Sequence, residues 1–263
     1  MICAGLDAGS RATKVVLFDC DNKRILAQDL ADQGVDQERL ASDLLDRACS
    51  AAKINRSDLK GIIATGYGRN RIGFANSTIT EITCHAKGVH HLCPQAQTII
   101  EIGGQDSKVI LLDNEGKVRD FSMNDRCAAG SGRFLEVVAS RLEVDLPTLG
   151  KLSNASRNPS LISSMCVVFA ETEIIGLLSE GVGAADIAAG VQNAIAQRVM
   201  ALAGRNVQGP VCFTGGVALQ SGMVRALETA LKTKVIVASI PQYTGALGAA
   251  LMAGQKASTG LVQ

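Results

Sequence analysis

The chain has 263 residues, of which 47% are hydrophobic and 3% aromatic, with 27 glycines and no tryptophan. This composition is typical of an α/β protein with a large core of Ala, Val, Ile and Leu. The net charge of +1 gives no basic field for nucleic acid, and no apolar stretch approaches the roughly 18 residues of a membrane helix, so we expect a cytoplasmic protein that binds neither nucleic acid nor membrane.

Apolar runs and turn residues predict two similar halves. The first half is expected to contain strands at residues 1–7, 13–19 and 24–30, a helix at 36–52 and a further strand at 59–65. The second half reopens with strands at residues 98–103, 108–113 and 117–122. Its later elements are expected as helices at 127–143, 166–180 and 184–205, a strand at 210–214, a helix at 220–231, a strand at 234–238 and a last helix from 245. We therefore expect an N-terminal half of residues 1–95 and a C-terminal half of residues 96–263.

The same phosphate-loop pattern occurs once in each half. Residues 7–19 align without a gap on residues 101–113, at an offset of 101 − 7 = 94. An acidic residue, a glycine, a hydroxyl residue, a lysine and an aspartate occupy equivalent positions in the two copies. In each copy small residues turn the chain between two apolar runs, which predicts two strands joined by a tight turn. Two such hairpins that face each other would hold one nucleotide.

The first copy carries the chemistry of a phosphate site. Gly9 permits close backbone approach, and Lys14 can add a positive charge beside a bound phosphate. Asp7 is placed where a carboxylate could hold Mg²⁺ through water. N–H groups for the phosphate oxygens are expected from the residues of the turn, Ser10, Arg11, Ala12 and Thr13. Taken alone, this pattern would fit an ordinary β-turn equally well.

The second copy and a third glycine motif strengthen the nucleotide hypothesis. Gly103 and Gly104 repeat the turn, and Gln105 or Asp106 is a candidate to orient the attacking water at a γ-phosphate. Further along, a predicted strand ends in a glycine pair before a helix, where the backbone could lie against ribose and adenine. These adenosine-binding candidates are Gly215, Gly216 and Val217.

Two halves with these three motifs in order resemble the actin-like, sugar-kinase and chaperone ATPase superfamily over the whole chain. The resemblance implies an α/β fold of two ribonuclease-H-like halves with ATP or ADP between them, and Asp7, Gln105 and Asp106 as catalytic candidates. A small-molecule kinase and a nucleotide-gated regulatory protein remain alternatives. A kinase would need an acceptor pocket, and the chain has little room for the longer insertions that usually supply one.

Two of the eight cysteines stand at predicted helix starts. Cys127 follows the candidate caps Asn124 and Asp125, and Cys166 begins the next helix. A helix N-terminus favours anionic sulfur, which suits a ligand of a metal cluster. Two thiolates cannot complete an ordinary four-cysteine site, but a two-fold dimer doubles them. On spacing alone, two buried cysteines are the more common arrangement. Burial in the core is expected for Cys3, Cys49 and Cys212.

Six segments resemble those of the ATP-dependent activators of 2-hydroxyacyl-CoA dehydratases, a family that includes the ATPase subunits of benzoyl-CoA reductases. They are residues 65–70, 81–85, 102–108, 124–134, 163–173 and 245–251. The resemblance implies a homodimer that holds one [4Fe-4S] cluster between subunits through Cys127 and Cys166 of each. It also implies Mg²⁺-dependent ATP hydrolysis coupled to one-electron transfer into a dehydratase or acyl-CoA reductase, with a ferredoxin or flavodoxin as the upstream donor.

A competing group of metal-ligating side chains lies between Cys84 and Cys93, with His85, His90 and His91. Their spacing fits no closed zinc template, and a helix would spread them over different faces. We therefore expect no metal there. Residues 65–70 are expected to form a loop near the nucleotide or a partner, and their role stays open.

Overall fold

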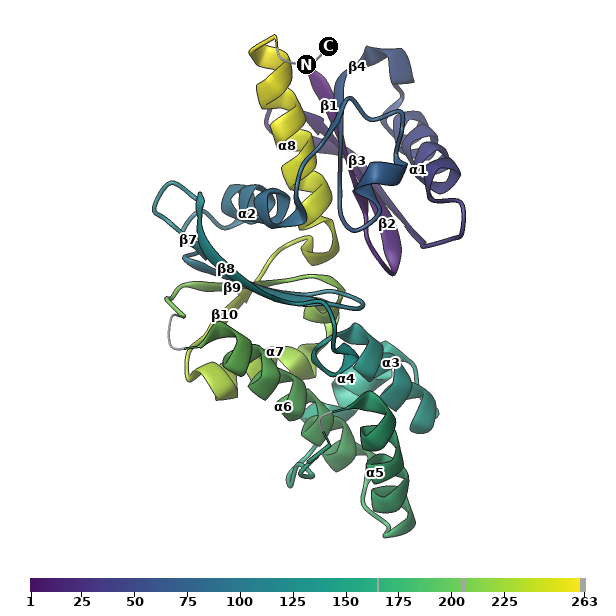
Figure 1. The fold of residues 1–263 in the computed structure, drawn as a ribbon, viewed down its shortest axis with the longest axis vertical. Helices are drawn as coiled ribbons and strands as arrows, with labels where there is room; N and C mark the ends of the chain where they lie inside the picture. Colours follow the sequence, from purple (N-terminus) through teal and green to yellow (C-terminus); the bar gives the residue numbers. More distant parts are fainter. Residues whose placement is uncertain (165, 205–206, 261–263) are drawn as a thin grey trace. The chain divides into compact units, whose positions relative to one another are not determined.

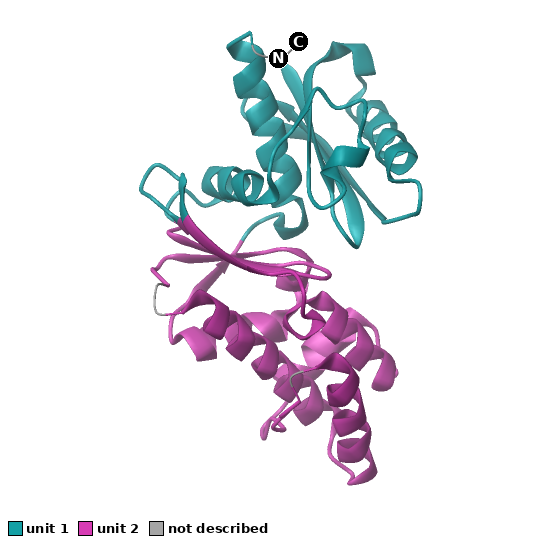
Figure 2. Ribbon diagram, in the orientation of Figure 1, with its two compact units in different colours: residues 1–95, 112–119, 238–263 teal, residues 96–111, 120–237 magenta. Residues whose placement is uncertain are grey.

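The computed structural model describes residues 1–164, 166–204 and 207–260. The chain forms two compact units (Figure 2). The first contains residues 1–95, 112–119 and the C-terminal segment from Ala238, and the second contains residues 96–111 and 120–237. This division differs from the expected halves mainly at the C-terminus, because the last helix packs on the N-terminal sheet.

The first unit is built on a five-stranded sheet of order β3-β2-β1-β4-β5 (Figure 1). The first three strands form the expected antiparallel meander, and β4 and β5 extend the sheet in parallel. The strands are β1 (Ile2–Ala8), β2 (Ala12–Asp19), β3 (Arg24–Asp32), β4 (Leu59–Thr65) and β5 (Ser77–Thr78). Only the short β5 was not predicted.

Helices cover both faces of this sheet. Alternate residues of β1 face opposite ways, so Leu6 packs in one cluster with Leu44 and Leu45 of α1 (Gln37–Ala52), while Cys3 packs on the other face. That second face is covered by α2 (Glu81–Leu92) and α8 (Thr244–Ser258). The approach of α8 is close because glycines lie at the contacts. A Cβ at Gly5 would lie 1.9 Å from the Ala246 carbonyl oxygen.

The second unit repeats the meander in a sheet of order β10-β9-β6-β7-β8. β6 and β7 are antiparallel, and β9 and β10 run parallel to β6. The strands are β6 (Thr98–Ile102), β7 (Ser107–Leu112), β8 (Val118–Asn124), β9 (Val211–Thr214) and β10 (Val235–Val237). Both sheets therefore place the hairpin next to a parallel strand that comes later in the chain.

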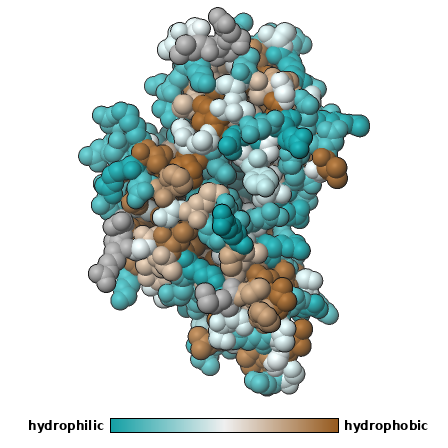
Figure 3. Space-filling model, in the orientation of Figure 1, coloured by the Kyte–Doolittle hydropathy of each residue, from teal (hydrophilic) through white to brown (hydrophobic). Residues whose placement is uncertain are grey.

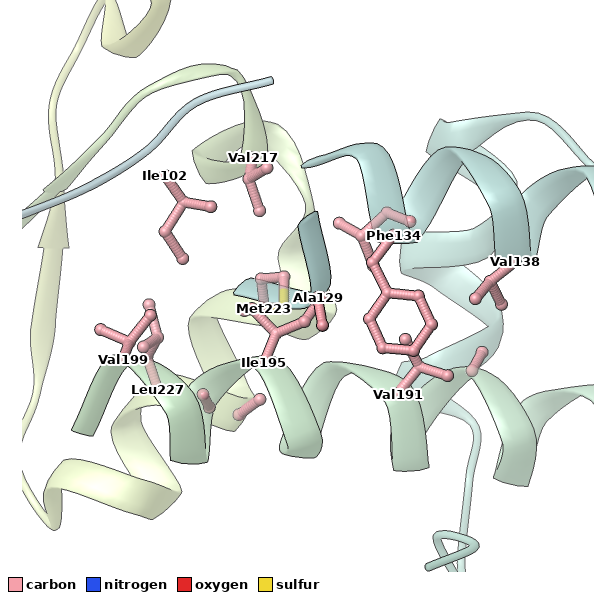
Figure 4. Packing of buried hydrophobic residues seen from close by; sticks show 14 of the residues in the cluster. Ile102, Ala129, Phe134, Val138, Val191, Ile195, Val199, Val217, Met223 and Leu227 are labelled. Carbon is pink, nitrogen blue, oxygen red and sulfur yellow. The ribbon is translucent and has the colours of Figure 1, made fainter. Parts of the chain in front are cut away.

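Within the described residues, the second sheet shares one core with the helices α3 (Gly132–Arg141), α4 (Leu146–Asn154), α5 (Val167–Ser179), α6 (Ala184–Ala203) and α7 (Ser221–Leu231). Figure 4 shows the core that they share, in which Ile102 of β6, Phe134 of α3, Ile195 of α6 and Met223 of α7 lie together. None of the helices within the described residues is long and apolar enough to span a membrane.

The predicted helix at 127–143 is wrong at its start, because α3 begins only at Gly132. A short 3-10 turn, η3 (Ala128–Gly130), comes first, and Ser131 is extended with φ −134° and ψ 174°. Glycines disfavour a continuous helix here. The helix α4 was missed, although the sequence has an aspartate at its N-cap, Asp145, and a proline in its first turn. In the structure Asp145 accepts a hydrogen bond from the Thr148 N–H.

Candidate functional site

The first candidate phosphate turn, within residues 7–14, places a carboxylate opposite an ammonium group. Asp7 pairs with Lys14 across the antiparallel register of β1 and β2, and the Lys14 Nζ lies 3.4 Å from Asp7 Oδ2. The Gly9 N–H donates to the Ala12 carbonyl oxygen at 3.1 Å and closes the turn. Asp7 is 6% exposed. The expected hairpin is therefore present, with its acidic and basic residues in contact.

The predicted phosphate-binding residues of this turn occupy two kinds of position. Ser10 is half-buried and Arg11 is exposed, and both precede β2. Ala12 and Thr13 are already part of β2, and the Thr13 hydroxyl donates to Gln33 Oε1 at 2.7 Å. Ser10 and Arg11 are thus the side chains placed at the tip of the turn.

Two glycines from distant segments lie against the Asp7 carboxylate. Gly66 has φ +89°, and a Cβ there would lie 2.4 Å from Asp7 Oδ1. A Cβ at Gly245 would lie 3.1 Å from Asp7 Oδ2 and 3.3 Å from His85 Nε2. The other ring nitrogen of His85 lies 2.9 Å from Thr244 Oγ1. The loop at 65–70, whose role the sequence left open, is thus part of the surroundings of Asp7.

In the second candidate phosphate turn, within residues 101–108, the lysine is bonded differently. The Lys108 Nζ lies 2.8 Å from Glu101 Oε2 and 2.6 Å from Asp106 Oδ2, and its side chain is only 1% exposed. The Gly103 N–H donates to the Asp106 carbonyl oxygen at 2.9 Å. Gln105 is exposed at the tip. Of the two candidates for orienting water, Gln105 faces solvent, whereas Asp106 is held in an ion pair.

A glycine after the parallel strand recurs in the second unit. Gly215 has φ +88°, and a Cβ there would lie 2.7 Å from Glu101 Oε1. Thr65 is in register with Asp7, and Thr214 is in register with Glu101. The duplication thus includes a Thr-Gly pair beside each acidic residue. A gapless alignment misses this pair, because the intervening segments differ in length.

The second phosphate turn is bonded directly to the start of α3. The Gly132 N–H donates to the Gly103 carbonyl oxygen at 2.9 Å, and the Arg133 N–H donates to the Gly104 carbonyl oxygen at 2.8 Å. A Cβ at Gly132 would lie 3.0 Å from the same Gly103 oxygen and 3.2 Å from a methyl group of Val217. The phosphate turn, the adenosine-binding candidate Val217 and the segment after Cys127 therefore meet at one glycine.

Cys127 and Cys166 are the exposed thiols among the eight cysteines, and the others are buried or half-buried. Cys127 was predicted in the first turn of an α-helix, but it lies directly before the 3-10 turn η3. Of its two candidate caps, Asn124 is in place. Its Oδ1 accepts from the Cys127 N–H at 3.1 Å, and its Nδ2 donates to the Cys127 carbonyl oxygen at 2.9 Å. Cys166 was predicted in the first turn of a helix, but it occupies the cap position of α5, one residue before the helix begins at Val167.

The loop before Cys166 is bonded to Glu173 of α5. Burial alone would raise the pKa of Glu173, but hydrogen bonds from Ser163 and Ser164 outweigh it and lower the pKa to about 2. The carboxylate is therefore held in its charged form across the neutral pH range. Sequence analysis included Glu173 as the last residue of the segment 163–173 but assigned it no role, because its bond to Ser163 joins residues ten positions apart.

The competing metal group on α2 has separate partners for its side chains. His85 contacts Thr244, and the His91 ring packs edge-on against Phe18 with centroids 5.4 Å apart. Burial raises the pKa of Cys84 to about 12. Within the residues that the structure describes, no group of three or more His, Cys, Asp or Glu side chains is arranged to hold a metal ion.

Comparison with known sequences finds matches along nearly the whole chain. The model of the BadF/BadG/BcrA/BcrD ATPase family matches residues 4–253. The 2-hydroxyisocaproyl-CoA dehydratase activator of Clostridioides difficile is 45% identical over 258 residues, which are 98% of this chain and 96% of that protein. The (R)-2-hydroxyglutaryl-CoA dehydratase activating ATPase of Acidaminococcus fermentans is 42% identical over 259 residues, 97% of each chain.

Solved structures confirm the predicted fold class. The C. difficile activator, solved with bound ADPNP, matches with a TM-score of 0.94 and covers 99% of this chain and 97% of that one. A ROK family glucokinase from Streptomyces griseus matches with a TM-score of 0.60 at 14% identity, covering 97% of this chain and 100% of that one, and this likeness concerns the fold alone.

Proposed function

Because this chain belongs to the BadF/BadG/BcrA/BcrD ATPase family, we propose that it hydrolyses ATP to drive one-electron transfer into a 2-hydroxyacyl-CoA dehydratase or a related acyl-CoA reductase. The observation that carries the proposal is the exposure of Cys127 and Cys166 in a chain so similar to dehydratase activators. A small-molecule kinase shares only the fold and has no use for two exposed thiols.

The nucleotide chemistry is assigned to the two hairpin turns. Asp7 would hold Mg²⁺ through water, and the turn at Ser10 would bind phosphate beside Lys14. Gln105 would orient the attacking water, a role that requires a positioned amide rather than a strong base. The bound ADPNP of the C. difficile activator supports ATP or ADP as the ligand here. Asp7→Asn should weaken Mg²⁺-dependent hydrolysis and raise the Mg²⁺ concentration that it requires. Unchanged hydrolysis at every Mg²⁺ concentration would contradict this assignment.

The two exposed thiols fit an iron–sulfur ligand set. Thiolate is the protein ligand of [4Fe-4S] clusters, which are held by four cysteines. Cys127 and Cys166 would supply half of the set, and the same residues of a second copy the other half. Such a cluster, when bound, supplies one electron at low potential. Neither thiol is enclosed by its own chain, as a site shared between two copies requires.

Exposed apolar side chains around Cys166 support a homodimer. Val168 and Phe169 follow this cysteine on α5 and are 66% and 70% exposed, and Leu161 before it is 84% exposed. Apolar side chains in brown lie on the surface in the lower part of the molecule, the region that contains α5 (Figures 1 and 3). Adjoining exposed apolar residues are typical of interaction sites. A second copy would cover them and bring its own thiols alongside.

The contact at Gly132 supports coupling between nucleotide and cluster. A change at the second phosphate turn would act on the carbonyl groups of Gly103 and Gly104, to which the start of α3 is bonded. Ala129 and Phe134, on either side of that contact, are buried in the same core as Ile195 of α6 (Figure 4). Cys127 lies two residues before Ala129, so a movement of the turn would be transmitted through these contacts toward this thiol.

Anaerobic purification followed by iron analysis tests the proposal. The wild-type homodimer should be brown and contain iron, and Cys127→Ser or Cys166→Ser should each abolish iron binding, because symmetry removes two ligands at once. Cys49→Ser is the matched control, since Cys49 is buried in the core of the first unit and should leave iron unchanged. A colourless, iron-free wild-type protein with ATPase activity would contradict the electron-transfer function.

A further inference from the structure

Two charged side chains, Glu173 and Arg198, form hydrogen bonds with the backbone N–H and C=O of Ser164, two residues before Cys166. Glu173 accepts hydrogen bonds from the Ser163 N–H, the Ser163 hydroxyl and the Ser164 N–H, each at 2.9 Å. Arg198 donates to the Ser164 carbonyl oxygen at 2.8 Å. The N–H and the C=O of Ser164 are thus bonded to opposite charges, two residues before the thiol.

These bonds tie the loop to two helices. Hydrogen bonds to an ionised group are roughly twice as strong as those between neutral groups, so a carboxylate with three donors fixes the loop firmly. Arg198 is itself anchored on α6, where it also donates to the Ala194 carbonyl oxygen at 3.0 Å. The neighbouring Ile195 and Val199 are buried in the core of the second unit. Ser164 is therefore connected through Arg198 to α6, which contributes buried residues to the core of that unit.

We propose that Glu173 and Arg198 are positioning residues for the Cys166 thiol. They act through the backbone of Ser163 and Ser164 and need no contact with metal or nucleotide. The inference rests on the proposed function, because it requires Cys166 to be a cluster ligand. Cys127 is held in another way, by the amide of Asn124 on its own backbone groups. The backbone of Cys127 is thus bonded by a neutral amide, whereas the backbone at Ser163 and Ser164, before Cys166, is bonded by charged side chains.

The test compares Glu173→Gln and Arg198→Gln with two controls. Glu171→Gln changes a carboxylate on the same helix that pairs with Arg141 instead of the loop. Arg198→Lys keeps a charged donor. Iron release from the anaerobically purified, reduced homodimer to a chelator should be about tenfold faster in the two Gln variants at 173 and 198, as expected for a lost hydrogen bond to a charged group. Release should stay near the wild-type rate in both controls.

Two further readouts separate a displaced ligand from general damage. The EPR signal of the reduced protein should change in Glu173→Gln but not in Glu171→Gln. Amide hydrogen exchange at Ser163 and Ser164 should accelerate in cluster-free Glu173→Gln, which requires no iron. Wild-type release rates and an unchanged EPR signal in both Gln variants would overturn the inference while leaving the proposed function intact. Absence of iron from the wild-type protein would instead overturn the proposed function.

Discussion

Lys108 forms a buried ion pair with Glu101 at the base of the second phosphate turn, with Nζ 2.8 Å from Oε2. The equivalent pair in the first turn is looser, since Lys14 Nζ lies 3.4 Å from Asp7 Oδ2 and the Lys14 side chain is 18% exposed. The same register position has therefore been used in two ways. In the second turn the lysine is enclosed by carboxylates, whereas in the first it remains accessible to a ligand.

Lys108→Met should destabilise the protein more than Lys14→Met. Removal of Lys108 leaves the buried Glu101 without its partner, and breaking a buried pair in this way costs about 3–5 kcal/mol. The Lys14 pair is longer and its lysine is partly exposed, so its loss should cost less, about 1–3 kcal/mol for leaving the buried Asp7 without a partner. Urea unfolding of both variants against wild type measures the difference. Equal losses of unfolding free energy in the two variants would mean that the two lysines contribute equally to stability.

Gln105→Ala should lower kcat for ATP hydrolysis by about 100-fold and leave KM nearly unchanged, because the exposed amide is assigned to water rather than to nucleotide binding. Asp106→Asn provides the contrast. Its carboxylate lies 2.6 Å from Lys108, so this change should mainly lower stability. Steady-state kinetics and urea unfolding of both variants separate the two roles. A larger loss of kcat in Asp106→Asn would reverse the assignment.

The hairpins were predictable because each depends on local pattern, with an apolar run, a turn of small residues and a second run. The Thr-Gly pairs at Gly66 and Gly215 were not, since their meaning lies in a parallel strand register that joins distant segments. The placement of α8 on the first sheet depends on tertiary packing at Gly5. The helix start at Gly132 was mispredicted because the pattern of apolar residues continued across two glycines.

Thiol labelling of the cluster-free protein should be selective. Cys127 and Cys166 are exposed and should react first with a maleimide at pH 8. Burial raises the pKa of both Cys3 and Cys84 to about 12, so these remain protonated and shielded at that pH. Mass spectrometry after brief labelling counts and locates the adducts. Early modification of Cys84 would contradict the packing of α2 against α8.

Glu173 should make the stability of the cluster-free protein depend on acid pH. Its folded pKa of about 2 lies below its ordinary value of 4.5, so the folded state binds fewer protons than the unfolded state between these values. The stabilisation is therefore complete above about pH 4.5 and lost as the pH falls through about 2. The difference in unfolding free energy between wild type and Glu173→Gln, measured by urea titration with circular dichroism, should shrink across this window. A constant difference would show that Glu173 does not titrate as described.

Gly132→Ala should weaken the coupling between nucleotide and cluster while both sites remain. The added methyl group would lie 3.0 Å from the Gly103 carbonyl oxygen and 3.2 Å from Val217, so the start of α3 must shift by a few tenths of an ångström against the phosphate turn. Iron content should be retained, because Cys127 and its clamp at Asn124 lie outside this contact.

The measurement is the reduction potential and chelator accessibility of the cluster with ADP, with a non-hydrolysable ATP analogue and without nucleotide. In wild type these values should differ among the three states, and in Gly132→Ala the differences should shrink. Gly34→Ala is the control, since a Cβ there meets nothing within 4 Å. Identical values in all three states of the wild-type protein would mean that nucleotide and cluster are not coupled, even if both sites are occupied. Wild-type differences retained in Gly132→Ala would instead place the coupling outside the contact between the second phosphate turn and α3.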